Sequence, residues 1–440
     1  MKKIKYFIFA FAMAFVGVLG VNAATATPEL TVIGSKNILL ANGTAITVEA
    51  PKTAGMGATV KWDGGEIEVP ADVTIFGGYH NDAANKVATN ITVNGGTVKN
   101  VFGGGLHISY VTDAKITVNG GKITGSIMGG GYEEFVNCGG TDFNAVTEAN
   151  VMSSTTKVDN AIITINGGNI DGAMIFGGGG AHSYTGTALI TINSHEGEIS
   201  YLIAGGSNGY TGNAEIVMND GQVDVVQSVN RGTMDTADIE IKGGKVDTAY
   251  VGGETDPSVT GTFNEANMTI TGGNVTNVEV GQNGVDENKQ SIPAKEATTI
   301  TYNKDTVENI DETQFRQEAI EKTVKVTFVY QGKEESEEIP YGTKFSDEDL
   351  NGLKLELNRE LEKSGLRLED FYADADFTKK FDMTQAFNAD ATIYINAVEL
   401  REDDGTKNPE TADIGLFTVI MTILLGTAGL GYTIKKRNFS

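Results

Sequence analysis

A short unit recurs through the middle of the chain, and this repeat constrains the fold more than any other feature. Its clearest copies are Ile-Thr-Val-Asn-Gly-Gly ending at Gly96 and at Gly121, and Ile-Thr-Ile-Asn-Gly-Gly ending at Gly168. Each is followed within a few residues by a second motif of the type Phe-Gly-Gly. Weaker copies carry the aligned glycine at Gly197, Gly221, Gly244 and Gly273, so most copies are 23 to 29 residues apart.

The repeat predicts stacked β-strands. Apolar residues alternate within each copy, as in Ile91 and Val93, and a period of two is typical of a strand with one buried face. No unit of this length can bury its apolar face alone, so successive units must stack. We therefore predict an all-β fold in which residues 71–290 form a right-handed parallel β-helix, with residues 24–70 as its N-terminal cap. A hairpin-based sheet sandwich is the alternative.

One asparagine falls at the same place in five copies, two residues before the aligned glycine in four of them and four residues before it in the other. The five are Asn94, Asn119, Asn166, Asn193 and Asn219. If the copies stack, these side-chain amides lie above one another at a corner and can hydrogen-bond along the column. The pattern of this half of the chain resembles the β-helix repeats of bacterial adhesins and autotransporter-like surface proteins.

The N-terminus has the features of a secretory signal peptide. Lys2, Lys3 and Lys5 precede an uncharged apolar run, which ends at Val21-Asn22-Ala23. A basic start, a short apolar core and a small-residue exit are the three parts of such a peptide. We expect cleavage after Ala23, so that residues 1–23 are removed on export.

The C-terminal region, residues 399–440, has the features of a membrane anchor. Residues 414–434 are uncharged and long enough to cross a bilayer, and Lys435, Lys436 and Arg437 follow. Before them lies the sequence Asn408-Pro409-Glu410-Thr411-Ala412. This order of motif, apolar stretch and basic tail resembles the sorting signal of sortase-type cell-wall-anchored proteins, which implies sortase and peptidoglycan as partners. A simple single-pass membrane anchor is the alternative.

The composition changes after the repeats. Residues 291–322 are polar, and we predict that they form a linker. Residues 323–398 contain an alternating strand near Val324 and the stretch Gly365 to Tyr372, and they resemble the internalin B-repeat, also called the Listeria–Bacteroides repeat. That resemblance implies a small β-grasp-like module that acts as a spacer or binding unit.

The chain is strongly acidic, with 33 basic and 58 acidic residues and a formal net charge of −25. This charge excludes nucleic acid as a partner and disfavours anionic lipid surfaces. Neither a catalytic residue nor a cofactor or metal site is predicted. His80, His107 and His182 each follow a Phe-Gly-Gly corner at a different offset, whereas metal ligands must converge.

Three tyrosines, Tyr110, Tyr184 and Tyr210, recur in the segments after the glycine corners. They are predicted either to stack on the sugar rings of a ligand or to pack as structural pegs. The predicted function is a non-catalytic adhesin or structural protein on a Gram-positive-type cell surface, with a host or glycan ligand. A surface-anchored carbohydrate-active enzyme, a polysaccharide lyase or hydrolase, is the alternative, and it would require a pair of carboxylates in a groove.

Overall fold

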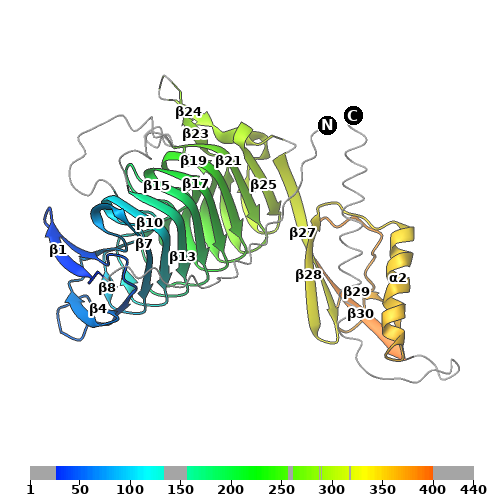
Figure 1. Ribbon diagram of the computed structural model, residues 1–440. Coiled ribbons are helices and arrows are strands. Elements are labelled where there is room, and N and C mark those ends of the chain that lie inside the picture. The colour runs from blue at the N-terminus through cyan, green and yellow to red at the C-terminus, as the bar shows by residue number, and fades with distance from the viewer. Residues whose placement is uncertain are drawn as a thin grey trace.

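The computed structural model describes residues 26–132, 156–255, 261–286, 288, 290–316 and 319–399. The described chain is mostly β-structure and contains two large sheets (Figure 1). Within the repeat region, neighbouring strands of both sheets run parallel. This arrangement is compatible with a β-helix and differs from the antiparallel pairing that a hairpin sandwich requires.

The first sheet is formed by short strands, one from each repeat unit. Its order is β1 (Glu29–Ile33), β2 (Lys36–Leu40), β6 (Thr74–Phe76), β9 (Asn100–Phe102), β12 (Ser126–Met128), β14 (Met174–Phe176), β16 (Ile199–Ile203), β18 (Gln222–Val229), β20 (Lys245–Gly253), β22 (Asn274–Glu279) and β26 (Val307–Ile310). Only β1 runs antiparallel to its neighbour on this path. β23 (Gln282–Val285) branches from the end of β20 as an antiparallel strand, and β24 (Ser291–Pro293) pairs antiparallel with β23.

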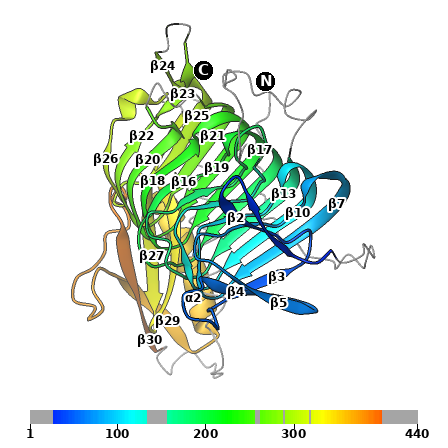
Figure 2. The ribbon, with the colours of Figure 1, turned by 90° about the vertical axis from the view of Figure 1, so that its left-hand side faces the viewer.

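The second sheet is formed by longer strands. In the repeat region it contains β3 (Ile46–Glu49), β7 (His80–Val93), β10 (Leu106–Val118), β13 (Lys157–Ile165), β15 (Tyr184–Ile192), β17 (Ser207–Met218), β19 (Arg231–Ile241), β21 (Thr262–Ile270) and β25 (Thr298–Asn303). The chain visits the two sheets in turn, so each repeat unit adds one strand to each (Figure 2). A small third sheet consists of β8 (Thr97–Val98) and β11 (Lys122–Ile123). Each of these strands belongs to a segment that connects a strand of the second sheet to the next strand of the first.

The main core lies between the sheets, because the alternating apolar residues point inward from both. On the second sheet, Ile91, Ile116 and Ile163 occupy one register position on successive strands and are fully buried. Leu39, Ile75 and Val101 do the same on the first sheet. Burying a side chain of this size stabilises the fold by about 1.5–3 kcal/mol, so the column of repeats supplies the stability that no single unit can.

The N-terminal end of the second sheet is closed by an antiparallel hairpin. β4 (Ala58–Trp62) pairs with β3 on one side and with β5 (Gly65–Val69) on the other. These strands fall within residues 24–70, for which a cap is predicted, and their buried residues Val60 and Val69 belong to the main core.

Residues 291–322 differ from the predicted linker. β25 and β26 extend the two large sheets by one further parallel strand each. Two short 3-10 helices, η2 (Ala294–Ala297) and η3 (Glu312–Gln314), lie beside them. The prediction failed because this unit lacks the paired glycines of the repeat, although the alternation of Thr298 to Asn303 is that of a strand.

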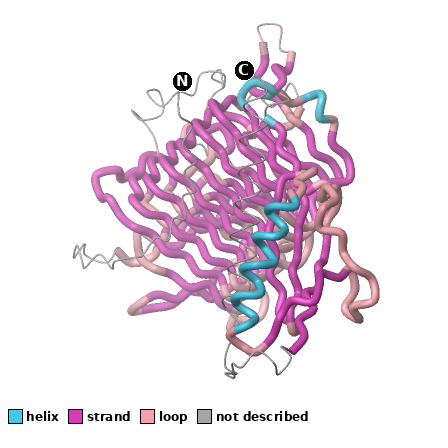
Figure 3. The backbone as a smooth tube through the Cα atoms, turned by 90° about the vertical axis from the view of Figure 1, so that its right-hand side faces the viewer, coloured by secondary structure: helices cyan, strands magenta, loops and turns pink. Residues whose placement is uncertain are grey.

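A second unit with its own core follows. It contains β27 (Ile320–Tyr330), β28 (Lys333–Pro340), α2 (Asp347–Glu362), β29 (Leu366–Tyr372) and β30 (Ala391–Glu399), with β27 between β28 and β30. Ser346 begins the helix with a capping box to Asp349. Leu353, Leu357 and Leu361 of α2 are buried in the core of this unit. Figure 3 shows the helix beside the strands of the unit.

The two units share a strand. The first residues of β27, from Ile320 to Thr323, pair in parallel with β25, and the later residues pair with β30. The side-chain amide of Asn303 donates to Asp390 at 3.2 Å and more weakly to Glu338 at 3.4 Å. The carboxylate of Asp390 also accepts the backbone N–H of Lys325 at 2.6 Å. We call this group of contacts the joint between the units; it consists of Glu338, Asp390, Asn303 and Lys325.

The joint should make stability depend on pH. Burial raises the pKa of Glu338, and the charge of the nearby Asp390 raises it further. The hydrogen bond from Asn303 lowers this pKa but does not cancel the increase. Because the folded pKa lies above the unfolded one, ionisation opposes folding, so stability falls as the pH rises from below the unfolded pKa through the folded pKa. We expect Glu338→Gln to stabilise the chain near pH 7 and to lose this advantage near pH 4, as measured by denaturant unfolding of the full chain at both values. Glu335→Gln, on the exposed part of β28, is the control; an equal gain at both pH values would contradict the prediction.

None of the helices in the described part of the chain has the length and apolar character needed to cross a bilayer. The predicted signal peptide with Ala23, and the predicted anchor with residues 414–434, lie outside the described residues. The same holds for the predicted sorting motif, Asn408, Pro409, Glu410, Thr411 and Ala412.

Candidate ligand-binding face

Because the strands pair in parallel, equivalent residues of successive repeats lie beside one another and form columns of side chains. In the second sheet, a residue on one strand lies beside its register partner on the next, about 4.8 Å away. The three predicted tyrosines occupy one such column, together with two lysines that sequence reasoning missed. The column consists of Lys86, Tyr110, Lys157, Tyr184 and Tyr210 on β7, β10, β13, β15 and β17.

The faces of these rings are covered by neighbours in the column. The rings of Tyr184 and Tyr210 are stacked, with centroids 5.3 Å apart and planes 9° from parallel. The ammonium groups of Lys86 and Lys157 lie 4.4 Å and 4.6 Å from the centroid of the Tyr110 ring. A sugar ring cannot stack on a face that another side chain already covers, so this geometry favours the packing role over sugar stacking.

The hydroxyl ends of the tyrosines are anchored by carboxylates. The Tyr110 hydroxyl donates to Asp159 at 2.8 Å, and the Tyr210 hydroxyl donates to Asp235 at 2.6 Å. Lys157 forms an ion pair with Asp159 at 2.9 Å. Burial lowers the pKa of Lys157, but the hydrogen bonds to Asp159 and Tyr110 outweigh it, so the pKa is raised and the lysine stays charged. The edge of the column therefore presents phenol oxygens, carboxylates and ammonium groups, which suit hydrogen bonding to a polar ligand.

The predicted asparagine column is confirmed. The side-chain amides of Asn119, Asn166, Asn193 and Asn219 each donate to the amide oxygen of the preceding member, at 3.0, 2.9, 2.8 and 2.7 Å in that order. At its N-terminal end, Asn94 donates to Glu49 at 3.1 Å. Each of these asparagine–asparagine bonds joins the side-chain N–H of one residue to the side-chain oxygen of the one before it. The column therefore stabilises the stacking of successive units.

The histidines lie at corners of the stack. The rings of His80 and His107 are 5.2 Å apart, and burial followed by the charge of His107 lowers the pKa of His80. His107 and His182 both adopt a left-handed backbone conformation, with φ of 54° and 55°. Within the described ranges, no group of three or more histidine, cysteine, aspartate or glutamate side chains has a metal-binding arrangement.

Two carboxylate pairs arise from the stacking and were missed at the level of sequence. Glu215 and Asp238 are register partners on β17 and β19, and Asp224 and Asp247 lie on β18 and β20. Partial burial by its neighbours raises the pKa of Glu215, and the charges of Asp238 and Glu240 raise it further. Each pair is 23 residues apart in sequence, so only an alignment of the weaker repeats could have revealed it.

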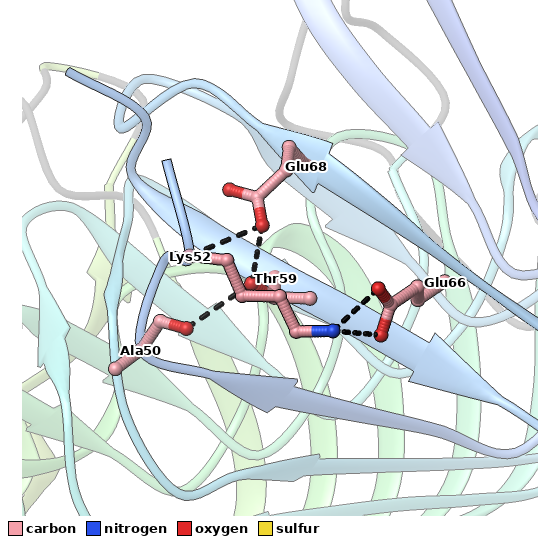
Figure 4. A network of polar contacts seen from close by, with 5 residues as sticks. All are labelled: Ala50, Lys52, Thr59, Glu66 and Glu68. Carbon is pink, nitrogen blue, oxygen red and sulfur yellow. Dashed lines mark hydrogen bonds and ion pairs between the residues drawn. The ribbon is translucent and has the colours of Figure 1, made fainter. Parts of the chain in front are cut away.

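A third polar cluster lies in the hairpin at the N-terminal end of the second sheet and in the segment before it (Figure 4). Lys52 contacts both carboxylate oxygens of Glu66, at 2.5 and 2.6 Å. The Thr59 hydroxyl donates to Glu68 at 2.6 Å, and this bond lowers the pKa of Glu68. Lys52 lies in the segment before β4, Thr59 lies in β4, and Glu66 and Glu68 lie in β5. We therefore infer that the cluster stabilises this hairpin.

Comparisons of the chain with protein-family models, curated proteins and solved structures find no match.

Proposed function

We propose that this chain is an exported, non-catalytic surface protein that acts as an adhesin or a structural component on a Gram-positive-type cell wall. In this proposal residues 71–290 form a right-handed parallel β-helix as the outer body, and residues 323–398 form a β-grasp-like stalk. The observation that carries the proposal is the set of polar columns on the second sheet and at the corner that follows it. Their side chains bind one another from strand to strand, as suits a stiff body that presents a surface.

The export and anchoring steps rest on the two ends of the sequence. Cleavage after Ala23 would release the chain outside the cell, and a sortase would cut after Thr411 and join the chain to peptidoglycan. Pro409 fixes an extended backbone in that motif, which an enzyme cleft can bind. If no sortase acts, residues 414–434 would hold the protein as a single-pass membrane protein.

Anchoring is testable by fractionation of cells that produce the full chain. We expect wild type in the peptidoglycan fraction, released only by wall-degrading enzymes, and Thr411→Ala in the membrane fraction, because the substitution removes the side chain that marks the cleavage position in the motif. Thr406→Ala, a threonine just before the motif, is the matched control and should behave as wild type. Wild type found wholly in the membrane fraction would contradict covalent anchoring.

The ligand half of the proposal is a glycan of the host or of a neighbouring cell. The edge of the tyrosine column, with Asp159 and Asp235 at its hydroxyl ends, offers the donors and acceptors that sugar hydroxyls need. A glycan array probed with the full chain tests this directly. If no glycan is retained on the array, the adhesin version fails and the structural version is favoured.

The second candidate is a polysaccharide hydrolase or lyase, and the pair Glu215 and Asp238 favours it. A carboxyl whose pKa is raised beside another carboxylate is the arrangement of a general acid with its partner. Incubation of any glycan found on the array with the full chain decides between the candidates. New reducing ends or unsaturated products that disappear with Glu215→Gln would establish the enzyme.

A further inference from the structure

One column on the outer side of the second sheet changes character along the stack. From β7 to β19, the residues at successive register positions are Asn90, Lys115, Ile162, Leu189, Glu215 and Asp238. The column is basic at one end, apolar in the middle and acidic at the other end. Its inward neighbours are the buried isoleucines of the main core, so these six side chains point away from that core.

The two charged ends do not neutralise each other. Lys115 and Glu215 are both exposed, and neither makes an ion pair with another residue that the structure describes. Three strand spacings separate them, about 14 Å, which is too far for a direct contact. Glu215 lies beside Asp238, so like charges are stacked at this end. Such a stack opposes folding, and although Lys242 of the same chain lies near enough to lower the pKa of Glu215, its ion pair is with Glu240.

We propose that this outer face of the second sheet binds the same face of a second copy of the chain, related by a two-fold axis that runs along the strands between β13 and β15. That axis reverses the order of the strands and keeps each column opposite itself. Lys115 then faces Glu215 of the other copy, Asn90 faces Asp238, and Ile162 faces Leu189. Each contact occurs twice, as in every isologous interface.

A neighbouring column is compatible with the same axis. It consists of Thr92, Thr117, Thr164, Thr191, Val217 and Glu240. Threonine meets threonine at its centre, Thr117 meets Val217, and Thr92 meets Glu240. No two like charges face each other in these two columns, and facing like charges are the contacts that reject a wrong partner.

The size of the face suits a stable dimer. It extends over β3, β7, β10 and β13 on one side of the axis and β15, β17, β19 and β21 on the other. Eight strands about 4.8 Å apart, with roughly 25 Å of strand length, give about 1,000 Å² per copy. A standard interface buries about 800 Å² per partner. Charge complementarity and area therefore point to the same occupant, a second copy.

A charge-swap experiment tests the proposal with the full chain in density-matched detergent, by sedimentation equilibrium. Wild type is expected to be dimeric. Lys115→Glu and Glu215→Lys should each weaken dimerisation by about tenfold or more, because each places two like-charge contacts in the interface. The double variant should recover the wild-type dimer. Lys122→Glu, on β11 of the third sheet, is the matched control and should dimerise as wild type.

Two results would overturn the proposal. The first is a wild-type chain that stays monomeric across the concentration range. The second is a double variant that dimerises as weakly as the single variants, because then the two charges do not meet. A monomer that retains a glycan, with retention lost in both single variants and not recovered in the double variant, would assign this face to a ligand instead.

Discussion

Gly177→Ala is expected to destabilise the chain by about 3 kcal/mol, at the upper end of the range for an overpacked core. Gly177 follows β14, at a point where the first sheet approaches the second. A Cβ added there would lie 2.3 Å from the carbonyl oxygen of Ala204 and 2.9 Å from the Cβ of Ala188. The first contact is with the backbone of the next unit, so relief requires the two units to move apart.

The structure supplies a matched control for this substitution. Gly205 follows β16 one unit later, and a Cβ added there has no neighbour closer than 3.4 Å. Gly205→Ala should therefore change the free energy of unfolding by less than about 0.5 kcal/mol. Denaturant unfolding of the full chain, followed by far-UV circular dichroism, measures both. Equal effects of the two substitutions would show that close approach is not the reason for glycine at position 177.

The glycine motif also shows what the sequence reveals and what it does not. A Gly-Gly pair that follows Phe or Met marks a corner in every clear unit, and the alternation of Ile and Val predicts the buried columns. The reason for glycine is steric and lies across the core: Gly103, Gly129 and Gly177 face Ala114, Ala161 and Ala188 of the second sheet. No local pattern indicates which alanine a glycine will meet, because the partners belong to different strands.

The asparagine and tyrosine columns show the same limit. The asparagines were predicted because they keep a nearly fixed place beside an aligned glycine, so stacking alone brings them together. The lysines of the tyrosine column were missed because Lys86 and Lys157 replace tyrosine at that position, and the insertion between Tyr132 and Lys157 hides the register. Substitution within a column is visible only once the strands are paired.

The joint between the two units was beyond sequence reasoning for a different reason. β27 begins as a partner of β25 and continues into the second unit, so one strand belongs to both. The alternation of Val324 to Tyr330 predicts the strand but not its partners. Asp390 completes the joint from 87 residues beyond Asn303, a separation that no repeat or motif connects.

Phe328→Ala should lower the stability of the second unit by about 3–5 kcal/mol, the usual cost of removing a buried phenylalanine side chain. Phe328 lies on β27, is fully buried, and packs in a core that is separate from the main core of the stack. The two cores share a strand but no buried cluster. We therefore expect the second unit to unfold first, while the stacked repeats keep their own transition.

Denaturant unfolding, monitored by amide hydrogen exchange, shows whether the two units unfold separately. In Phe328→Ala, exchange should accelerate in β28, β29, β30 and the later part of β27, whereas β13, β15 and β17 should keep wild-type protection. Leu355→Ala is the matched control, because Leu355 is 61% exposed on α2 of the same unit, and it should leave both transitions unchanged. Equal loss of protection in the repeats would mean that the shared strand makes the two units one cooperative structure, since a break in β27 would then spread through β25 into the stack.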